Sequence, residues 1–309
     1  SPGTVAAAGR ARSRGPRLLR VLTVTFPDDS WREDVGPVEG VDALVWDPAG
    51  GPPPEAEIDV VVAPYMSGSG WLDGLPQAPS TRLVQLLTAG FDGVPERLPQ
   101  GVRLANAKGV HDTATAELAL ALVLAAQRGL DEFAAAQRRG EWLPARVRPG
   151  LADHRVLLLG YGSVGRAIAA RLAPFEVRLT AVASRARDGD DLVDQVHGID
   201  ELAALLPEHD IVVSVLPGSA ATAGILDAAA LAALPDGALV VNVGRGSALV
   251  TDAALAEAGR LRFALDVTDP EPLPAGHPLW ERENVVITPH VASTTTDLLD
   301  TIRTWMQHA

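Results

Sequence analysis

The stretch Arg155-Val-Leu-Leu-Leu-Gly-Tyr-Gly-Ser-Val-Gly-Arg-Ala-Ile-Ala-Ala-Arg171 decides the predicted fold of this chain. It starts as an apolar run typical of a buried strand, turns through three glycines, and continues with the spacing of an amphipathic helix. In a dinucleotide-binding turn, the first glycine permits the tight turn, the second admits a pyrophosphate, and the third lets helix and strand pack closely. A helix that begins at Ser163 would also direct its unpaired N–H groups at the phosphates. The predicted cofactor contacts here are Gly160, Tyr161, Gly162, Ser163, Val164 and Gly165.

A glycine-rich turn formed only for packing is the alternative, and the surrounding pattern favours the dinucleotide site. Apolar runs typical of strands lie at 156–160, 177–183, 211–215, 238–242, 262–266 and about 285–288, with helical patterns such as 202–206 and 228–234 between them. Six strands joined by helices predict a doubly wound parallel sheet, which binds its ligand at the carboxyl ends of the strands.

A second, smaller α/β unit is predicted from five shorter apolar runs, at 21–26, 43–46, 58–63, 82–87 and 102–105. A long helix is expected over 111–128 and a final helix over 294–308. The predicted domains are a substrate domain of residues 19–107 plus 291–309 and a dinucleotide-binding domain of residues 108–290. Residues 1–18 contain arginines but no acidic residue, and we expect a terminal tail there.

Composition limits the classes of protein to which the chain can belong. The net charge of −13 argues against nucleic acid or an anionic membrane as a main partner, because both attract basic surfaces. The longest apolar run, 118–126, is much shorter than the roughly 20 residues of a membrane span. Without cysteine there can be no disulfide or thiolate metal site, and no metal site is predicted. Because the N-terminal segment lacks the apolar core of an export signal, a cytoplasmic location is expected.

Three motifs place reactive side chains directly after predicted strands. Residues 240–246 hold Arg245 between two glycines, residues 264–274 hold Asp266 and Glu271, and residues 284–293 hold His290. Each motif alone has a structural alternative, namely an arginine in a surface turn, an acid in a solvated loop or a histidine that caps the last helix. Together they indicate a site, because the carboxyl ends of parallel strands meet at one edge of the sheet.

With the glycine turn, these motifs resemble the D-isomer-specific 2-hydroxyacid dehydrogenases, a family that includes glyoxylate/hydroxypyruvate reductases and 3-phosphoglycerate dehydrogenases. The resemblance extends from about Leu83 to Ser293 and includes residues 85–92, 106–112 and 235–246. It implies an α/β fold in which a Rossmann dinucleotide domain is inserted in a smaller flavodoxin-like substrate domain. It also implies a homodimer, with 111–128 as a candidate interface helix.

By this resemblance, Arg245, Glu271 and His290 are the catalytic residues. A 2-keto acid that accepts hydride gains negative charge on its carbonyl oxygen, so the site needs a proton donor and a fixed cation. A histidine can give and take a proton near neutral pH, and Glu271 would orient the His290 ring and favour the imidazolium. The planar guanidinium of Arg245 suits a carboxylate and an adjacent carbonyl.

The resemblance also assigns binding residues around this set. Asp266 is expected near the nicotinamide carboxamide, and further cofactor contacts are assigned to Leu216, Pro217, Thr222 and Val243. Backbone segments at 65–68 and 88–90 are expected to bind the substrate carboxylate. The predicted substrate-binding residues are Tyr65, Met66, Ser67, Ala89, Gly90, Arg245 and His290.

The end of the second strand of the doubly wound sheet indicates which dinucleotide is bound. An NAD-specific site normally carries an acid there to bind the ribose hydroxyls, whereas a 2′-phosphate prefers arginine. Here Ala183 stands at the expected position of the acid and is followed by Ser184, Arg185 and Arg187. NADP(H) is therefore favoured, and NAD(H) stays possible.

The leading prediction is an NAD(P)H-dependent reductase that interconverts a small 2-keto acid, such as glyoxylate or hydroxypyruvate, and its D-2-hydroxy acid. A phosphoglycerate dehydrogenase is an alternative within the family. Formate dehydrogenase is disfavoured, because the residue paired with its histidine is glutamine and this chain has Glu271. A non-enzymatic corepressor that senses dinucleotides through the same fold is the alternative from another class.

Overall fold

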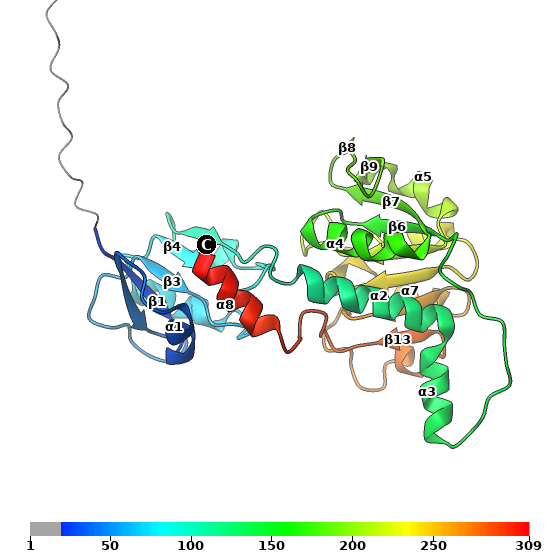
Figure 1. Ribbon diagram of the computed structural model, residues 1–309, viewed down its shortest axis with the longest axis horizontal. Coiled ribbons are helices and arrows are strands. Elements are labelled where there is room, and N and C mark those ends of the chain that lie inside the picture. Colours follow the sequence, from blue (N-terminus) through cyan, green and yellow to red (C-terminus); the bar gives the residue numbers. More distant parts are fainter. Residues whose placement is uncertain (1–19, 309) are drawn as a thin grey trace, which may run out of the picture. The chain divides into compact units, whose positions relative to one another are not determined.

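The computed structural model describes residues 20–308, which form two compact units (Figure 1). The first unit contains the described residues up to Gln85 together with Pro99–Leu104, and the second contains Leu86–Leu98 and the residues from Ala105 onward. The predicted tail at 1–18 lies outside the described residues. The division into a substrate domain of 19–107 plus 291–309 and a dinucleotide domain of 108–290 stays a prediction.

The first unit is built on a five-stranded sheet with the order β2-β1-β3-β4-β5. Strands β1, β2, β3 and β4 pair in parallel. This order is the flavodoxin-like one, as predicted. The elements are β1 (Leu22–Phe26), α1 (Asp29–Val35), β2 (Val41–Val45), β3 (Val60–Val62), β4 (Leu83–Gln85), β5 (Arg103–Ala105) and the short 3₁₀ helices η1 (Gly70–Asp73) and η2 (Leu75–Gln77).

The second unit is built on an eight-stranded sheet with the order β13-β12-β11-β10-β6-β7-β9-β8. All neighbouring strands are parallel except β8 and β9. The chain runs outward from β6 through β7 and then returns to β10 on the other side of β6, so the strand order reverses between β6 and β10. Its strands are β6 (Arg155–Leu159), β7 (Arg178–Ala183), β8 (Arg187–Asp188), β9 (Gln195–Gly198), β10 (Ile211–Ser214), β11 (Leu239–Asn242), β12 (Arg262–Leu265) and β13 (Val285–Ile287).

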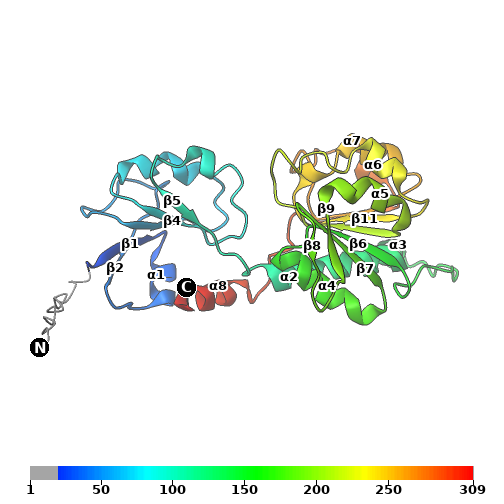
Figure 2. The same cartoon turned by 90° about the horizontal axis from the view of Figure 1, so that it is seen from above.

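Helices cover both faces of this sheet, because successive side chains of a strand point to opposite faces. On one face, Val156 and Leu158 of β6 pack with buried residues of α2 (Asp112–Arg128) and α4 (Ser163–Leu172). On the other face, Leu157 and Leu159 pack with α5 (Leu202–Leu205), α6 (Ala228–Ala233) and α7 (Thr251–Glu257). Figure 2 shows the two helical layers of this unit with the sheet between them.

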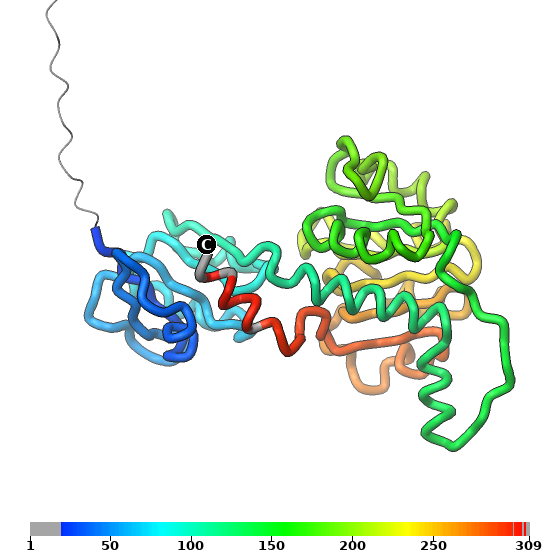
Figure 3. Tube along the Cα trace, viewed as in Figure 1, coloured from blue at the N-terminus to red at the C-terminus, as the bar shows by residue number. Residues whose placement is uncertain are grey.

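The six predicted strands of the doubly wound sheet are all present, which confirms the predicted fold class. The predicted helix over 111–128 is α2, and the predicted helix over 294–308 is the shorter α8 (Leu298–His308). Two features were not predicted: the hairpin formed by β8 and β9, and α3 (Leu130–Arg138). From α3 a long loop leads back to β6, and Figure 3 traces its path. Among the described residues, no helix combines the length and apolarity that a bilayer crossing demands.

Candidate active site

The glycine turn after β6 has the geometry that its sequence predicts. Gly160 has a φ of +106°, which a residue with a side chain rarely adopts. A Cβ atom at Gly165 would lie 2.1 Å from the carbonyl oxygen of Gly160, so only glycine lets α4 pack this closely on the turn. Gly160 and Gly165 therefore shape the turn between strand and helix.

The middle of the turn has the free space that a phosphate needs. Among residues 20–308, a Cβ atom at Gly162 would meet no heavy atom within 4 Å, and no side chain caps the N-terminus of α4. The first N–H groups of this helix are thus available to an anion. The hydroxyl of Ser163 donates a hydrogen bond to Asp112 at 3.1 Å, and Val164 packs against the core. The residues of the turn fit a dinucleotide pyrophosphate.

Tyr161 joins the turn to the hairpin of β8 and β9. Its ring is buried, and its hydroxyl donates to the two carboxylate oxygens of Asp190 at 3.0 and 3.2 Å. Burial, together with the bond to Asp190, raises the pKa of Tyr161 to about 12. Asp190 also accepts from Nε of Arg166 at 2.9 Å. The side chain of Tyr161 thus holds the hairpin in place, and its backbone belongs to the turn.

The two arginines that follow β7 differ in their surroundings. Arg187 donates to the carbonyl oxygen of Tyr161 at 2.6 Å, and its guanidinium carbon lies 6.0 Å from the centre of the Tyr161 ring. Ser184 and Arg185 are exposed. Within the part of the chain that the structure describes, Arg185 has no ion-pair or hydrogen-bond partner. Arg185 is therefore the cation at this strand end that can bind a phosphate without breaking another contact.

The loops after β10 and β11 meet beside the glycine turn. Leu216 and Val243 are buried, and a Cβ atom at Gly244 would lie 2.6 Å from the carbonyl oxygen of Leu216. The hydroxyl of Thr222 donates to the carbonyl oxygen of Pro217 at 2.6 Å and so closes its loop. These predicted cofactor residues all lie at the edge of the sheet where the strand order reverses, which is where doubly wound folds bind ligands.

Arg245 projects from the turn that follows β11. Its Nε donates to Asp92 at 2.7 Å and its Nη1 donates to the carbonyl oxygen of Gly244 at 2.9 Å. A Cβ atom at Gly246 would lie 1.9 Å from the carbonyl oxygen of Thr268. The glycine therefore lets the Arg245 turn contact the loop that leads to Glu271.

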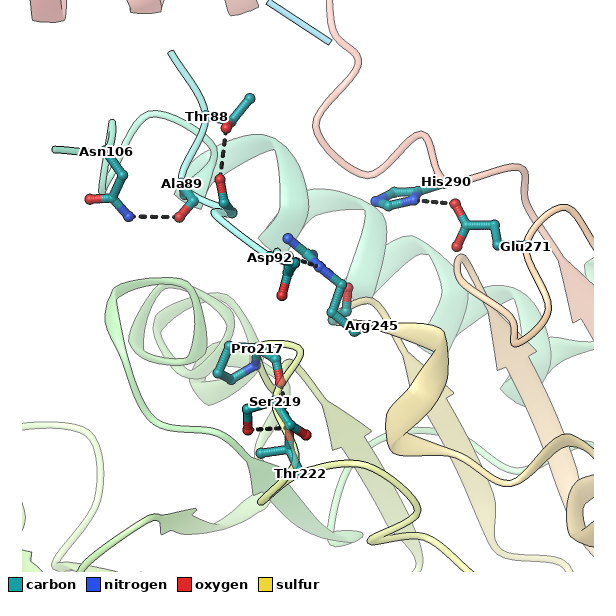
Figure 4. Close-up of polar contacts among 12 residues, drawn as sticks. Thr88, Ala89, Asp92, Asn106, Pro217, Ser219, Thr222, Arg245, Glu271 and His290 are labelled. Atoms are coloured by element: carbon teal, nitrogen blue, oxygen red, sulfur yellow. Dashed lines mark hydrogen bonds and ion pairs between the residues drawn. The ribbon is translucent and has the colours of Figure 1, made fainter. Parts of the chain in front are cut away.

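His290 and Glu271 form the closest polar pair of the predicted catalytic set (Figure 4). Nδ1 of His290 lies 2.5 Å from Oε1 of Glu271, and the two side chains are 44% and 40% exposed. The other ring nitrogen, Nε2, points away from the carboxylate. This half-exposed pair leaves Nε2 free to exchange a proton with a ligand.

Asp266 organises the loop that carries His290. Its buried carboxylate accepts from Thr288 Oγ1 at 2.6 Å and from the N–H groups of Val291 and Ala292 at 2.9 and 3.0 Å. The N–H of His290 donates to the carbonyl oxygen of Asp266 at 2.8 Å. These bonds hold His290 at a φ of +53°, a conformation that is uncommon for residues other than glycine.

In the segment 88–90 the carbonyl oxygens are hydrogen-bonded, whereas backbone N–H groups are left open for a ligand. The carbonyl oxygens of Thr88, Ala89 and Gly90 accept from Ala107 N at 2.9 Å, Asn106 Nδ2 at 2.7 Å and Thr88 Oγ1 at 2.8 Å. The N–H groups of Ala89 and Gly90 have no acceptor among the described residues. With its carbonyls occupied and its amides open, the segment suits a carboxylate.

The other predicted substrate loop belongs to the first unit. Tyr65 packs near Trp31 with ring centres 6.2 Å apart, Met66 is exposed with a φ of +55°, and Ser67 donates to the carbonyl oxygen of Pro64 at 3.1 Å. The second unit holds Ala89, Gly90, Arg245, Glu271 and His290.

Two residues near Arg245 were not predicted as site residues. Asp92 is its ion-pair partner. His111 stands at the start of α2, and its pKa is lowered, chiefly by burial and also by the charge of Arg245. Both lie inside the segments that carry the family resemblance, which is the only sequence signal that could have found them. Across the described residues, no cluster of His, Asp and Glu could hold a metal ion.

A doubly wound sheet that carries a glycine turn, an imidazole paired with a carboxylate, and a guanidinium in the same unit is the arrangement of a nicotinamide-dependent dehydrogenase. Residues 120–292 match the model of the D-isomer specific 2-hydroxyacid dehydrogenase NAD binding domain. The chain belongs to the D-isomer specific 2-hydroxyacid dehydrogenase family. This confirms the predicted family, the predicted oxidoreductase class and the predicted Rossmann fold.

Similarity to individual proteins supports the same family membership. The chain is 36% identical over 226 residues to glyoxylate/hydroxypyruvate reductase A of Serratia proteamaculans, covering 68% of this chain and 70% of that protein. It is 32% identical over 228 residues to glyoxylate reductase of Thermofilum pendens, covering 71% and 67%. A D-isomer specific 2-hydroxyacid dehydrogenase from Xanthobacter autotrophicus, crystallised with NADPH and MES, matches with a TM-score of 0.78 and 29% identity over 93% of this chain and 92% of that one.

Proposed function

We propose that this protein is an NADPH-dependent reductase that converts a small 2-keto acid, such as glyoxylate or hydroxypyruvate, to the D-2-hydroxy acid. The observation that carries the proposal is the hydrogen-bonded pair of His290 and Glu271, in the same unit as Arg245 and the open N–H groups of residues 88–90. The names of the relatives from Serratia and Thermofilum support the same substrate class.

Each side chain has a defined task in this reaction. Arg245 and the N–H groups of Ala89 and Gly90 bind the substrate carboxylate, and the guanidinium also polarises the keto oxygen. A nicotinamide supplies the hydride to carbon 2 when it is bound. Nε2 of His290 gives its proton to the keto oxygen as charge develops there, and Glu271 holds the ring through Nδ1. In the oxidative direction His290 accepts the proton back.

Cofactor preference is assigned to the end of β7. Ala183 leaves no carboxylate that would repel a 2′-phosphate, and Ser184 and Arg185 are exposed beside it. The relative from Xanthobacter, which was crystallised with NADPH, supports this preference. Arg187 already donates a hydrogen bond to Tyr161, so its role is to hold the end of β7 in shape. Arg185 is the residue that pairs with the 2′-phosphate of NADPH.

Arg185→Ala is expected to raise the KM for NADPH about tenfold, because one charge-assisted contact to a phosphate contributes about 1 to 2 kcal/mol. The KM for NADH should stay within about twofold, since NADH has no 2′-phosphate. Arg138→Ala, which removes an exposed arginine in the last turn of α3, is the matched control. Equal effects of Arg185→Ala on both cofactors would contradict the assignment.

The proposed function is tested by a panel of 2-keto acids with NADPH and with NADH, assayed in both directions. We expect oxidation of NADPH with at least one small 2-keto acid, and a higher kcat/KM with NADPH than with NADH. A protein that oxidises NADPH with no member of the panel would contradict the proposal and favour a sensing role. A strong preference for a phosphorylated 2-keto acid would instead favour the phosphoglycerate dehydrogenase alternative.

A cytoplasmic homodimer completes the proposal. Leu130 and Phe133 of α3 and Trp142 in the following loop are exposed, and apolar side chains in such a group mark association surfaces. They follow α2, the helix proposed for the interface. Light scattering that reports a monomer at micromolar concentration would contradict the dimer.

A further inference from the structure

The guanidinium of Arg245 is held at two of its three nitrogen atoms, Nε and Nη1. Asp92 accepts from its Nε at 2.7 Å, and the carbonyl oxygen of Gly244 accepts from Nη1 at 2.9 Å. Both partners belong to the second unit, although Asp92 and Arg245 are separated by 153 positions along the chain. Neither contact uses Nη2, so that nitrogen keeps its donors for another acceptor (Figure 4).

Gly90 and Gly218 leave the space that the side chains of Arg245 and Asp92 occupy. A Cβ atom at Gly90 would lie 2.1 Å from Nη2 of Arg245, and a Cβ atom at Gly218 would lie 2.4 Å from Oδ1 of Asp92. Neither glycine has a φ in the left-handed region, so the local backbone conformation does not require glycine there. What excludes a side chain at Gly90 is the end of Arg245, and what excludes one at Gly218 is the carboxylate of Asp92.

This geometry places Nη2 beside the segment whose N–H groups are open. Gly90 contributes an open N–H group and also lies against Nη2. A carboxylate that accepts from this segment would therefore also reach the free side of Arg245. Asp92 bonds to Nε, which is a different nitrogen from the one that such a ligand would contact.

The ion pair between Arg245 and Asp92 contributes little to the stability of the fold. The side chains of Arg245 and Asp92 are 32% and 41% exposed, and exposed pairs contribute about 0 to 1 kcal/mol. Its effect on ligand binding is larger, because a free arginine side chain loses rotamer freedom when it binds. An arginine that is already fixed avoids most of that cost.

We propose that Asp92 is a positioning residue, which holds the guanidinium of Arg245 by Nε so that Nη2 and the N–H groups of residues 88–90 form one carboxylate-binding surface. This inference rests on the proposed function for the identity of the ligand, a 2-keto acid. Gly90 and Gly218 keep the positions of the two side chains free. Asp92 itself does not contact the substrate.

The first test reads the orientation of Arg245 directly and does not depend on activity. In protein labelled with ¹⁵N-arginine, we expect a sharp, slowly exchanging Nε–H signal for Arg245, assigned by its loss in Arg245→Lys. Asp92→Asn should broaden that signal or shift it toward the position of solvent-exposed arginines. A signal unchanged in Asp92→Asn would overturn the proposal.

The second test uses kinetics to separate positioning from general damage. Asp92→Asn and Gly90→Ala should each raise the KM for the 2-keto acid about tenfold, while the Kd for NADPH changes by less than about twofold. In an Arg245→Lys background, Asp92→Asn should have almost no further effect, because residues that act through one another are not additive. Effects that multiply in the double variant would overturn the proposal.

Asp210→Asn is the control for the loss of a carboxylate. Asp210 pairs with Arg155 at 3.0 Å at the start of β10 and β6, at the opposite end of those strands from the site. The Asp210→Asn variant should leave the KM for the keto acid unchanged. If the wild-type protein reduces no 2-keto acid, the proposed function fails, and the ¹⁵N signal in Asp92→Asn still decides whether Asp92 positions Arg245.

Discussion

His290→Gln is expected to lower kcat for 2-keto acid reduction about a thousandfold, within the range of 10² to 10⁴ typical of general acid catalysis. Glutamine keeps a polar side chain of similar length but cannot give a proton to the developing alkoxide. Steady-state kinetics with a saturating keto acid measure the effect. The Kd for NADPH should change little, because the glycine turn lies between β6 and α4, whereas His290 follows β13.

Glu271→Gln is expected to lower kcat less than His290→Gln does. The amide oxygen can still accept from Nδ1, but it carries no negative charge to stabilise the imidazolium, so a smaller loss of kcat, about tenfold to a hundredfold, is expected. A His290→Gln variant with kcat within about threefold of the wild type would remove His290 from the proton transfer. An intact fold, shown by unchanged circular dichroism, is required for either conclusion.

Arg245→Ala is expected to lower kcat/KM about a thousandfold or more, because it removes both the carboxylate contact and the charge that polarises the keto oxygen. The loss should appear in KM and in kcat together, since the first contact exists before the reaction and the second strengthens in the transition state.

Arg245→Lys separates charge from geometry. A lysine restores the positive charge but cannot bind Asp92 and a substrate with a planar fork, so we expect only partial recovery, to within about a hundredfold of the wild type. Full activity in Arg245→Lys would show that a point charge is sufficient and would contradict the fixed guanidinium that the contacts with Asp92 and Gly244 describe.

The glycine turn and the strands of the doubly wound sheet can be predicted from the sequence, because each depends on residues that are close together along the chain. The turn at 160–165 requires glycine for reasons of φ and close packing that involve only neighbouring residues and the adjacent strand. The strands of the doubly wound sheet appear as apolar runs, since both of their faces are buried. Glu271 and His290 were named through the family resemblance, and the structure brings their side chains into contact.

Other features could not be predicted from local pattern. The hairpin of β8 and β9 has strands of two and four residues, too short and too polar to show a periodicity. The pairing of Asp92 with Arg245 joins positions 153 residues apart, and no spacing rule relates them. The bonds from Asp266 to the loop of His290 likewise depend on the order in which β12 and β13 are placed in the sheet.

The central claim is that a hydride reaches carbon 2 of a 2-keto acid while His290 supplies the proton to its oxygen. It is tested most directly with hydroxypyruvate and NADPH deuterated at both positions of the nicotinamide C4, with the product examined by mass spectrometry and chiral chromatography. The account predicts D-glycerate with a single deuterium, bound to carbon 2. Unlabelled glycerate, or the L isomer, would contradict it.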